Sequence, residues 1–141
     1  MARTRVETRA RARVLQALYA WDMRGNGSED LVRVATQVWD DLAITPDERR
    51  IAGPIVRMLA SRSRQLDAEL ADVTTNWRLE RIGAVERCVL RMGAAELTIG
   101  ETPPRVVIQE AVTLAERFGS AQSAKFVNGV LDALARRMGR I

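Results

Sequence analysis

Apolar residues recur at intervals of three and four along almost the whole chain, and this spacing constrains the fold more than any other feature of the sequence. In the first segment the recurring residues are Val14, Leu15, Leu18, Tyr19 and Trp21. Residues three and four apart share one face of an α-helix, whereas a half-buried strand alternates at every second residue. The sequence contains no strand-like alternation of useful length and no repeat of fixed period. We therefore predict an all-α protein.

Capping residues and helix breakers divide this pattern into six or seven helices. The predicted helices cover residues of about 5–24, 29–44, 46–73, 84–99, 104–118 and 121–138. Ser28 and Ser120 are predicted to cap the second and the last helix. Because the connections are only a few residues long, neighbouring helices are expected to pack against each other in a compact bundle.

The third helical segment carries the clearest start signal and also an interruption. Thr45-Pro46-Asp47-Glu48 supplies an N-cap residue, a proline at the first helical position and a glutamate three residues after the cap, which together form a capping box. Pro54 lies inside the segment, where it lacks a backbone donor and clashes with the preceding turn. We therefore expect either a kink or two helices that meet near residues 61–63.

Missing residue types exclude several classes of site. The chain has no histidine, so it cannot supply a Ser-His-Asp triad, a Cys-His pair or histidine ligands for zinc. Its one cysteine, Cys88, permits neither an intrachain disulfide nor a thiolate-only zinc site, and its apolar position indicates a core residue. The carboxylate pairs Asp40/Asp41 and Asp47/Glu48 lie at helix ends, where capping and the helix dipole explain them. We predict no enzyme activity, no cofactor and no metal.

The sequence also lacks the signals of a membrane or secreted protein. No apolar segment approaches the roughly 20 residues of a membrane span. The basic N-terminus leads into an amphipathic pattern and not into the apolar region of a signal peptide. We therefore expect a soluble protein of the cytoplasm.

Basic residues gather at the two ends of the chain. Of the 22 basic residues, 21 are arginine and only Lys125 is lysine, an excess that GC-rich codon usage would also produce. Their positions are therefore more informative than their number. The N-terminal group consists of Arg3, Arg5, Arg9, Arg11 and Arg13, and the C-terminal group consists of Arg136, Arg137 and Arg140. Such groups are typical of nucleic-acid-binding surfaces and also of solvated tails.

One face of the first helix is rich in guanidinium groups. At about 100° per residue, a sector of roughly 80° opposite the apolar stripe contains Arg5, Arg9, Arg13 and Gln16. We refer to these four residues as the arginine face. Because arginine binds phosphate through paired hydrogen bonds and stacks on bases, this face is predicted to bind single-stranded RNA; an ordinary solvated helix face is the alternative. Arg11 lies on the apolar side, which indicates a partly buried ion pair or a contact to another protein.

Three stretches of the sequence are informative when they are read together. They are Ala10-Arg11 with Gln16-Ala17-Leu18-Tyr19, then 85–91 (VERCVLR) with Glu96-Leu97, then 108–112 (IQEAV) with Phe118-Gly119 and 125–132 (KFVNGVLD). These stretches closely resemble the NusB family of bacterial transcription antitermination factors. The resemblance runs nearly from end to end and is weakest over residues 25–75, and its final stretch is the most specific part.

The resemblance implies a fold of two helical subdomains and a role as an adaptor. Members of this family bind the boxA element of nascent RNA together with the ribosomal protein NusE, as part of an RNA polymerase antitermination complex, and some members form homodimers. By position, Gln122, Lys125 and Phe126 join the arginine-rich first helix on the RNA-facing side. Tyr19 and Glu86 match the NusE-facing surface. The resemblance therefore implies one NusB-like RNA-binding domain over the whole chain.

Several positions depart from the family pattern. Glu7 stands where a basic residue is usual, which would weaken the contact with RNA. Gln109 replaces the usual asparagine, Ala95 stands where an aromatic residue is common, and both changes concern local packing. From its neighbours alone, Phe126 is open to two interpretations, a core residue or an exposed platform on which a base stacks.

Two other functions are kept as alternatives. The chain could be a helical homodimeric interaction module without RNA function, in which the arginine face is ordinary surface. It could also be an accessory domain for RNA recognition in ribosomal RNA processing or methylation, because similar helical domains occur fused to ribosomal RNA methyltransferases. The chain itself has no room for the catalytic domain of such an enzyme and no glycine-rich cofactor motif.

Overall fold

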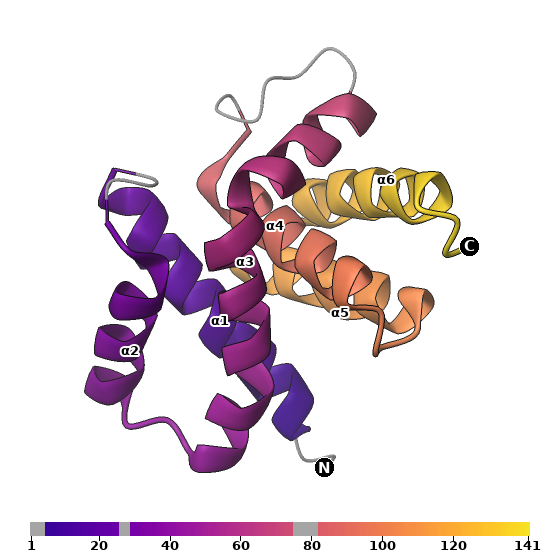
Figure 1. Ribbon diagram of the computed structural model, residues 1–141. Coiled ribbons are helices and arrows are strands. Elements are labelled where there is room, and N and C mark those ends of the chain that lie inside the picture. The colour runs from indigo at the N-terminus through magenta and orange to yellow at the C-terminus, as the bar shows by residue number, and fades with distance from the viewer. Residues whose placement is uncertain (1–4, 26–28, 75–81) are drawn as a thin grey trace. The chain divides into compact units, whose positions relative to one another are not determined.

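The protein is built from α-helices. The computed structural model describes residues 5–25, 29–74 and 82–141, and over these residues it contains six helices and no strand (Figure 1). The helices are α1 (Val6–Met23), α2 (Leu31–Leu42), α3 (Pro46–Val73), α4 (Ala84–Ile99), α5 (Pro104–Phe118) and α6 (Ala121–Arg137). The all-α prediction is therefore confirmed. None of the described helices is both long and apolar enough to cross a membrane.

Side chains cap the helices largely where the sequence indicates. Thr45 and Glu48 form the predicted capping box: the Glu48 N–H donates to Thr45 Oγ1 at 3.1 Å, and the Thr45 N–H donates to Glu48 Oε1 at 2.8 Å. Ser120 caps α6 by accepting from the Ser123 N–H at 3.1 Å. The second helix begins later than predicted, and Asp30 caps it by accepting from the Val32 N–H. The predicted cap Ser28 lies outside the described residues.

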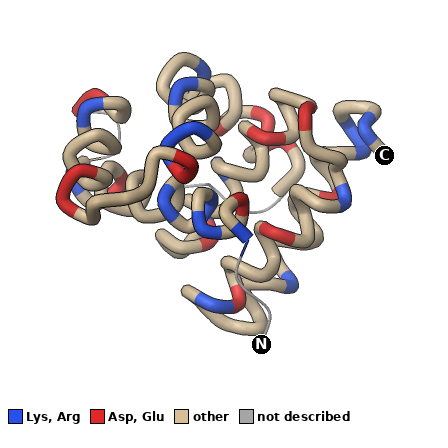
Figure 2. The backbone as a smooth tube through the Cα atoms, turned by 90° about the horizontal axis from the view of Figure 1, so that it is seen from below, with Lys and Arg blue, Asp and Glu red and all other residues tan. Residues whose placement is uncertain are grey.

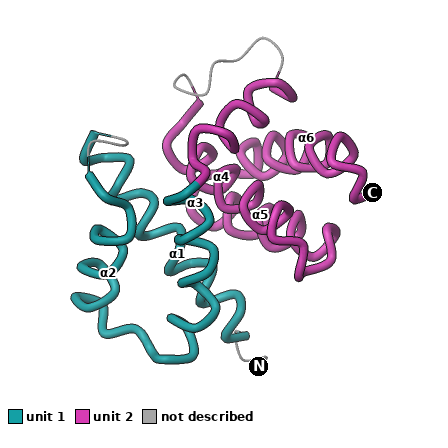
Figure 3. Tube along the Cα trace, in the orientation of Figure 1, with its two compact units in different colours: residues 1–61 teal, residues 62–141 magenta. Residues whose placement is uncertain are grey.

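The long helix α3 contains one break. Arg62 has non-helical backbone angles, with φ −131° and ψ 22°, whereas the helix continues through Pro54. Of the two expectations for this segment, the meeting of two helices near residues 61–63 is therefore the correct one. The break coincides with the division of the chain into two compact units, residues 1–61 and 62–141 (Figure 3). This organisation agrees with the two helical subdomains that the family resemblance implies.

The first unit packs α2 against the apolar side of α1. Leu18 is 1% exposed, and full burial of a leucine side chain contributes about 1.5–3 kcal/mol to stability. Two tryptophans add hydrogen bonds to this packing, because Trp39 Nε1 donates to the Arg13 carbonyl at 2.9 Å and Trp21 Nε1 donates to the Glu29 carbonyl at 2.8 Å. These contacts fix which side of α1 is buried and leave its opposite side for the arginine face.

The second unit is organised around α4, on which α5 and α6 pack. Every residue of α4 from 88 to 97 is buried, including the predicted core residue Cys88. Gly93 allows α6 to approach closely, because a Cβ there would lie 2.7 Å from Leu131 Cδ1. The buried Arg91 is paired through two hydrogen bonds of 2.9 and 3.0 Å with the Asp67 carboxylate. From residue 88 to residue 97, α4 therefore forms the core of the second unit.

Candidate nucleic-acid interface

The arginine face lies on the outer side of α1. Arg5 and Arg9 are exposed, and Arg13 and Gln16 are half-buried. Figure 2 marks the basic positions, some of which gather at the start of this helix. Arg11 is 4% exposed, so it lies on the buried side of α1 as the sequence indicates. The exposed positions leave guanidinium groups accessible to a ligand along one side of the helix.

A buried carboxylate lies beneath this face. Glu48 Oε2 is 3.3 Å from Arg13 Nε and 3.6 Å from Arg9 Nε, and the Glu48 side chain is only 2% exposed. Arg13 has a second contact, because its Nη1 donates to Gln16 Oε1 at 3.2 Å. Burial raises the pKa of the Glu48 carboxyl, but the hydrogen bonds from Thr45 and the charge of Arg13 outweigh it, so the pKa lies below its ordinary value. Glu48 is therefore a charged partner of two predicted RNA ligands.

The sequence prediction missed this role of Glu48. The Thr45–Glu48 spacing identifies the residue as a helix cap, and the cap occupies only one carboxylate oxygen. The other oxygen contacts a helix that precedes it by 35 residues in the chain. No local pattern in a single sequence reports a contact over that separation.

The predicted RNA residues of α6 share one side of its first two turns. Gln122 and Lys125 are exposed and Phe126 is half-buried. Spacings of three and four residues place them together, on the side of the helix away from the buried Ser123 and Val127. Phe126 is therefore neither a fully buried core residue nor a fully exposed platform.

Tyr19 and Glu86, the residues predicted to face NusE, differ in their surroundings. Tyr19 on α1 is 44% exposed. Glu86, in the first turn of α4, is half-buried and accepts a hydrogen bond from Ser123 Oγ at 2.8 Å. Its carboxylate also covers Gly83, where an added Cβ would lie 2.5 Å from Glu86 Oε2. Glu86 therefore has a structural role in its own unit, whatever it binds outside.

The C-terminal arginines are all engaged within the second unit. Arg136 Nε lies 2.9 Å from Asp132 Oδ2, and Arg137 Nη2 lies 3.2 Å from Asp72 Oδ2. The Arg140 guanidinium lies against Gly100, which ends α4 with φ 76°. The side chains of Arg136 and Arg137 nevertheless remain 63% and 56% exposed, so a contribution of this group to RNA binding stays a prediction.

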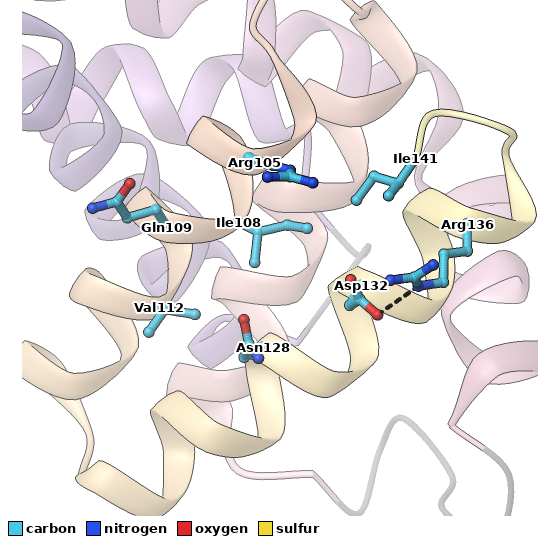
Figure 4. Close-up of a pocket in the computed structure, with 8 residues that line it drawn as sticks. All are labelled: Arg105, Ile108, Gln109, Val112, Asn128, Asp132, Arg136 and Ile141. Carbon is cyan, nitrogen blue, oxygen red and sulfur yellow. Dashed lines mark hydrogen bonds and ion pairs between the residues drawn. The ribbon is translucent and has the colours of Figure 1, made fainter.

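A groove of about 400 Å³ runs between α5 and α6 (Figure 4). Its lining consists of Arg105, Ile108, Gln109, Val112, Asn128, Asp132, Arg136 and Ile141. Two polar residues of the KFVNGVLD stretch, Asn128 and Asp132, therefore line a surface groove, a location that the motif alone did not indicate. Gln109 is exposed, so its difference from the family's asparagine concerns this groove and not the packing of the core.

The described residues contain no group of three or more acidic or cysteine side chains that could hold a metal ion. The guanidinium groups and the amide on α1, and separately the lysine and the half-buried aromatic residue on α6, have the chemistry that suits recognition of phosphates and bases.

Comparisons with known proteins identify the family. The NusB family model matches residues 8–136. The transcription antitermination protein NusB of Anaeromyxobacter dehalogenans is 42% identical over 131 residues, which cover 91% of this chain and 89% of that protein. The solved structure of T. maritima NusB is similar with a TM-score of 0.81 at 29% identity, covering 96% of this chain and 93% of that one. A chain in the crystal structure of antitermination factors NusB and NusE in complex with dsRNA gives a TM-score of 0.84 at 28% identity, covering 96% and 99%. The chain belongs to the NusB family.

Proposed function

We propose that this protein is a non-enzymatic transcription antitermination factor of the cytoplasm that binds boxA RNA together with NusE. One observation carries the proposal: the fold matches, over 96% of the chain, that of a chain in a complex of NusB, NusE and RNA. The bound adaptor would then join the RNA polymerase antitermination complex. Residues 1–141 act in this proposal as one RNA-binding domain.

Contacts with RNA come from both units in this proposal. On α1, Arg5, Arg9 and Arg13 bind phosphates and Gln16 adds a polar contact. On α6 the ligands are Gln122, Lys125 and Phe126, whose partly exposed ring stacks on an unpaired base. Their shared helix faces and their match to the family's RNA-facing positions support all of these residues, and exposure also supports Arg5, Arg9, Gln122 and Lys125.

NusE binds at Tyr19 and Glu86 in this proposal. An exposed tyrosine buries its ring against a partner while its hydroxyl forms a hydrogen bond, which makes tyrosine frequent at the centres of interfaces. A carboxylate suits the basic surface of a ribosomal protein. Because RNA and NusE bind the same molecule, each raises the local concentration of the other.

A gel-shift titration with boxA RNA, with and without NusE, tests the proposal. The protein alone should shift the RNA, and NusE should tighten that binding. A control RNA of the same length and scrambled sequence should bind more weakly in the presence of NusE. Absence of any shift in both conditions, from a folded protein, would leave the interaction module without RNA function as the better account.

A further inference from the structure

Two arginines of the arginine face converge on one oxygen atom. Glu48 Oε2 is within 3.6 Å of Arg9 Nε and accepts a hydrogen bond from Arg13 Nε at 3.3 Å. Both contacts use the Nε edge of the guanidinium group. A guanidinium group carries five N–H donors, which allows it to bind a carboxylate and a phosphate at the same time.

The helix cap does not use Glu48 Oε2. The capping box uses Glu48 Oε1, which accepts from the Thr45 N–H, and the Glu48 N–H, which donates to Thr45 Oγ1. Glutamine serves at this position of a capping box as well as glutamate does. The second acceptor, Oε2, is therefore available for the arginines, and only a carboxylate supplies both acceptors at once.

Arg13 is held at two points. Its Nε donates to Glu48 and its Nη1 donates to Gln16 Oε1 at 3.2 Å. A long side chain with two fixed contacts has few rotamers left, so less conformational entropy is lost when it binds a ligand. The same argument applies in part to Arg9, whose Nε lies 3.6 Å from Glu48 Oε2.

We propose that Glu48 is a positioning residue of the RNA site, which holds Arg9 and Arg13 through their Nε atoms and so fixes where their guanidinium groups meet the RNA backbone. The inference rests on the proposed RNA binding and goes beyond it, because Glu48 itself, 2% exposed, does not reach the ligand. It has a counterintuitive consequence. Removal of this negative charge from a site for a polyanion weakens binding.

The test is a comparison of three variants in RNA binding by fluorescence anisotropy. Glu48→Gln removes the second acceptor and the charge. Asp47→Asn is the charge control, because Asp47 is 73% exposed, pairs with Arg50 and loses the same charge at the same helix start. Thr45→Ala is the capping control, because it removes the hydroxyl that caps α3 and leaves Glu48 Oε2 in place.

Glu48→Gln is expected to weaken RNA binding roughly tenfold, since two rotamer-rich side chains must then be ordered by the ligand. Asp47→Asn should bind as tightly as the unchanged protein or slightly tighter, and Thr45→Ala should bind like the unchanged protein below its melting temperature. If Glu48→Gln binds RNA as tightly as Asp47→Asn, the affinity depends only on the net charge and the positioning role is wrong. If Thr45→Ala loses as much affinity as Glu48→Gln, the effect belongs to the helix cap and the positioning role is also wrong.

Arginine Nε–H signals in NMR spectra of the unchanged protein give a second readout that does not depend on the folding of a variant. Two of these protons, from Arg9 and Arg13, should exchange slowly with water and stay protected when RNA is added. Rapid exchange of both would overturn the inference while RNA binding itself stands. Failure of the unchanged protein to bind RNA would instead overturn the proposed function.

Discussion

The arginine face of the first unit and the C-terminal arginines of the second unit are alike in the sequence and differ in the acids that they meet. Arg9 and Arg13 share one buried carboxylate, Glu48. Arg136 and Arg137 each pair with a separate, exposed aspartate. A buried shared acid orders the groups around it, whereas exposed pairs are screened by water and contribute about 0–1 kcal/mol each. A count of basic residues therefore does not distinguish the two groups, whereas the arrangement of the acids beside them does.

The largest expected effect separates NusE binding at Glu86 from RNA binding at the arginine face. Glu86→Lys should weaken NusE binding about 100-fold or more, because a positive charge then meets a basic partner. RNA binding by the isolated chain should persist, since the arginine face is unchanged. Calorimetry with NusE and anisotropy with RNA measure the two affinities.

Ser123→Ala is the matched control for this change, because it removes the hydrogen bond that Glu86 accepts and keeps the carboxylate. Unchanged NusE affinity in Glu86→Lys, together with a lower melting temperature in both variants, would show that Glu86 serves only its own unit.

Arg13→Gln should lower the free energy of unfolding by about 1–3 kcal/mol, because the buried Glu48 carboxylate loses its closest cationic partner. Arg136→Gln, which breaks an exposed pair within one helix, should change it by less than about 0.5 kcal/mol. Urea denaturation measures both. Equal losses in the two variants would remove the distinction between the two basic groups.

The charge of the buried Glu48 carboxylate should also make stability depend on pH, with a smaller effect than the loss of Arg13. Since the folded pKa of Glu48 lies below its ordinary value of 4.5, the ionised carboxylate stabilises the fold above that value. This contribution is lost as the pH falls through the folded pKa. Glu48→Gln should therefore be less stable than the unchanged protein at neutral pH, and the difference should shrink as the pH falls below 4.5. A difference that is constant with pH would indicate that the charge of Glu48 contributes nothing.

Much of the fold follows from local sequence signals. The Thr45–Glu48 capping box, the Ser120 cap and the glycine at position 100 mark helix ends through interactions over a few residues, so a single sequence reveals them. The sequence leaves two alternatives for the third helix, a kink caused by Pro54 or a break near residues 61–63, because proline is the residue that most disfavours a helix interior. Local patterns contain no signal that decides between the two positions.

The candidate site was predictable only in part, for the same reason. Helical spacing places Arg5, Arg9 and Arg13 on one face, but the sequence does not show that Glu48 lies beneath two of them. Likewise, the helix position of Phe126 is clear from its neighbours, whereas its half-buried state depends on residues far away in the chain.

The salt dependence of RNA binding tests most directly the central claim that the arginine face of α1 supplies phosphate ligands. Three arginines that each neutralise one phosphate of a single RNA strand predict a slope of about −2 for log affinity against log salt concentration. Arg5→Gln, at an exposed position outside the Glu48 contacts, should reduce the magnitude of this slope by about 0.7, and Arg136→Gln should leave it unchanged. A slope near zero for the unchanged protein, or an equal reduction by Arg136→Gln, would contradict the account.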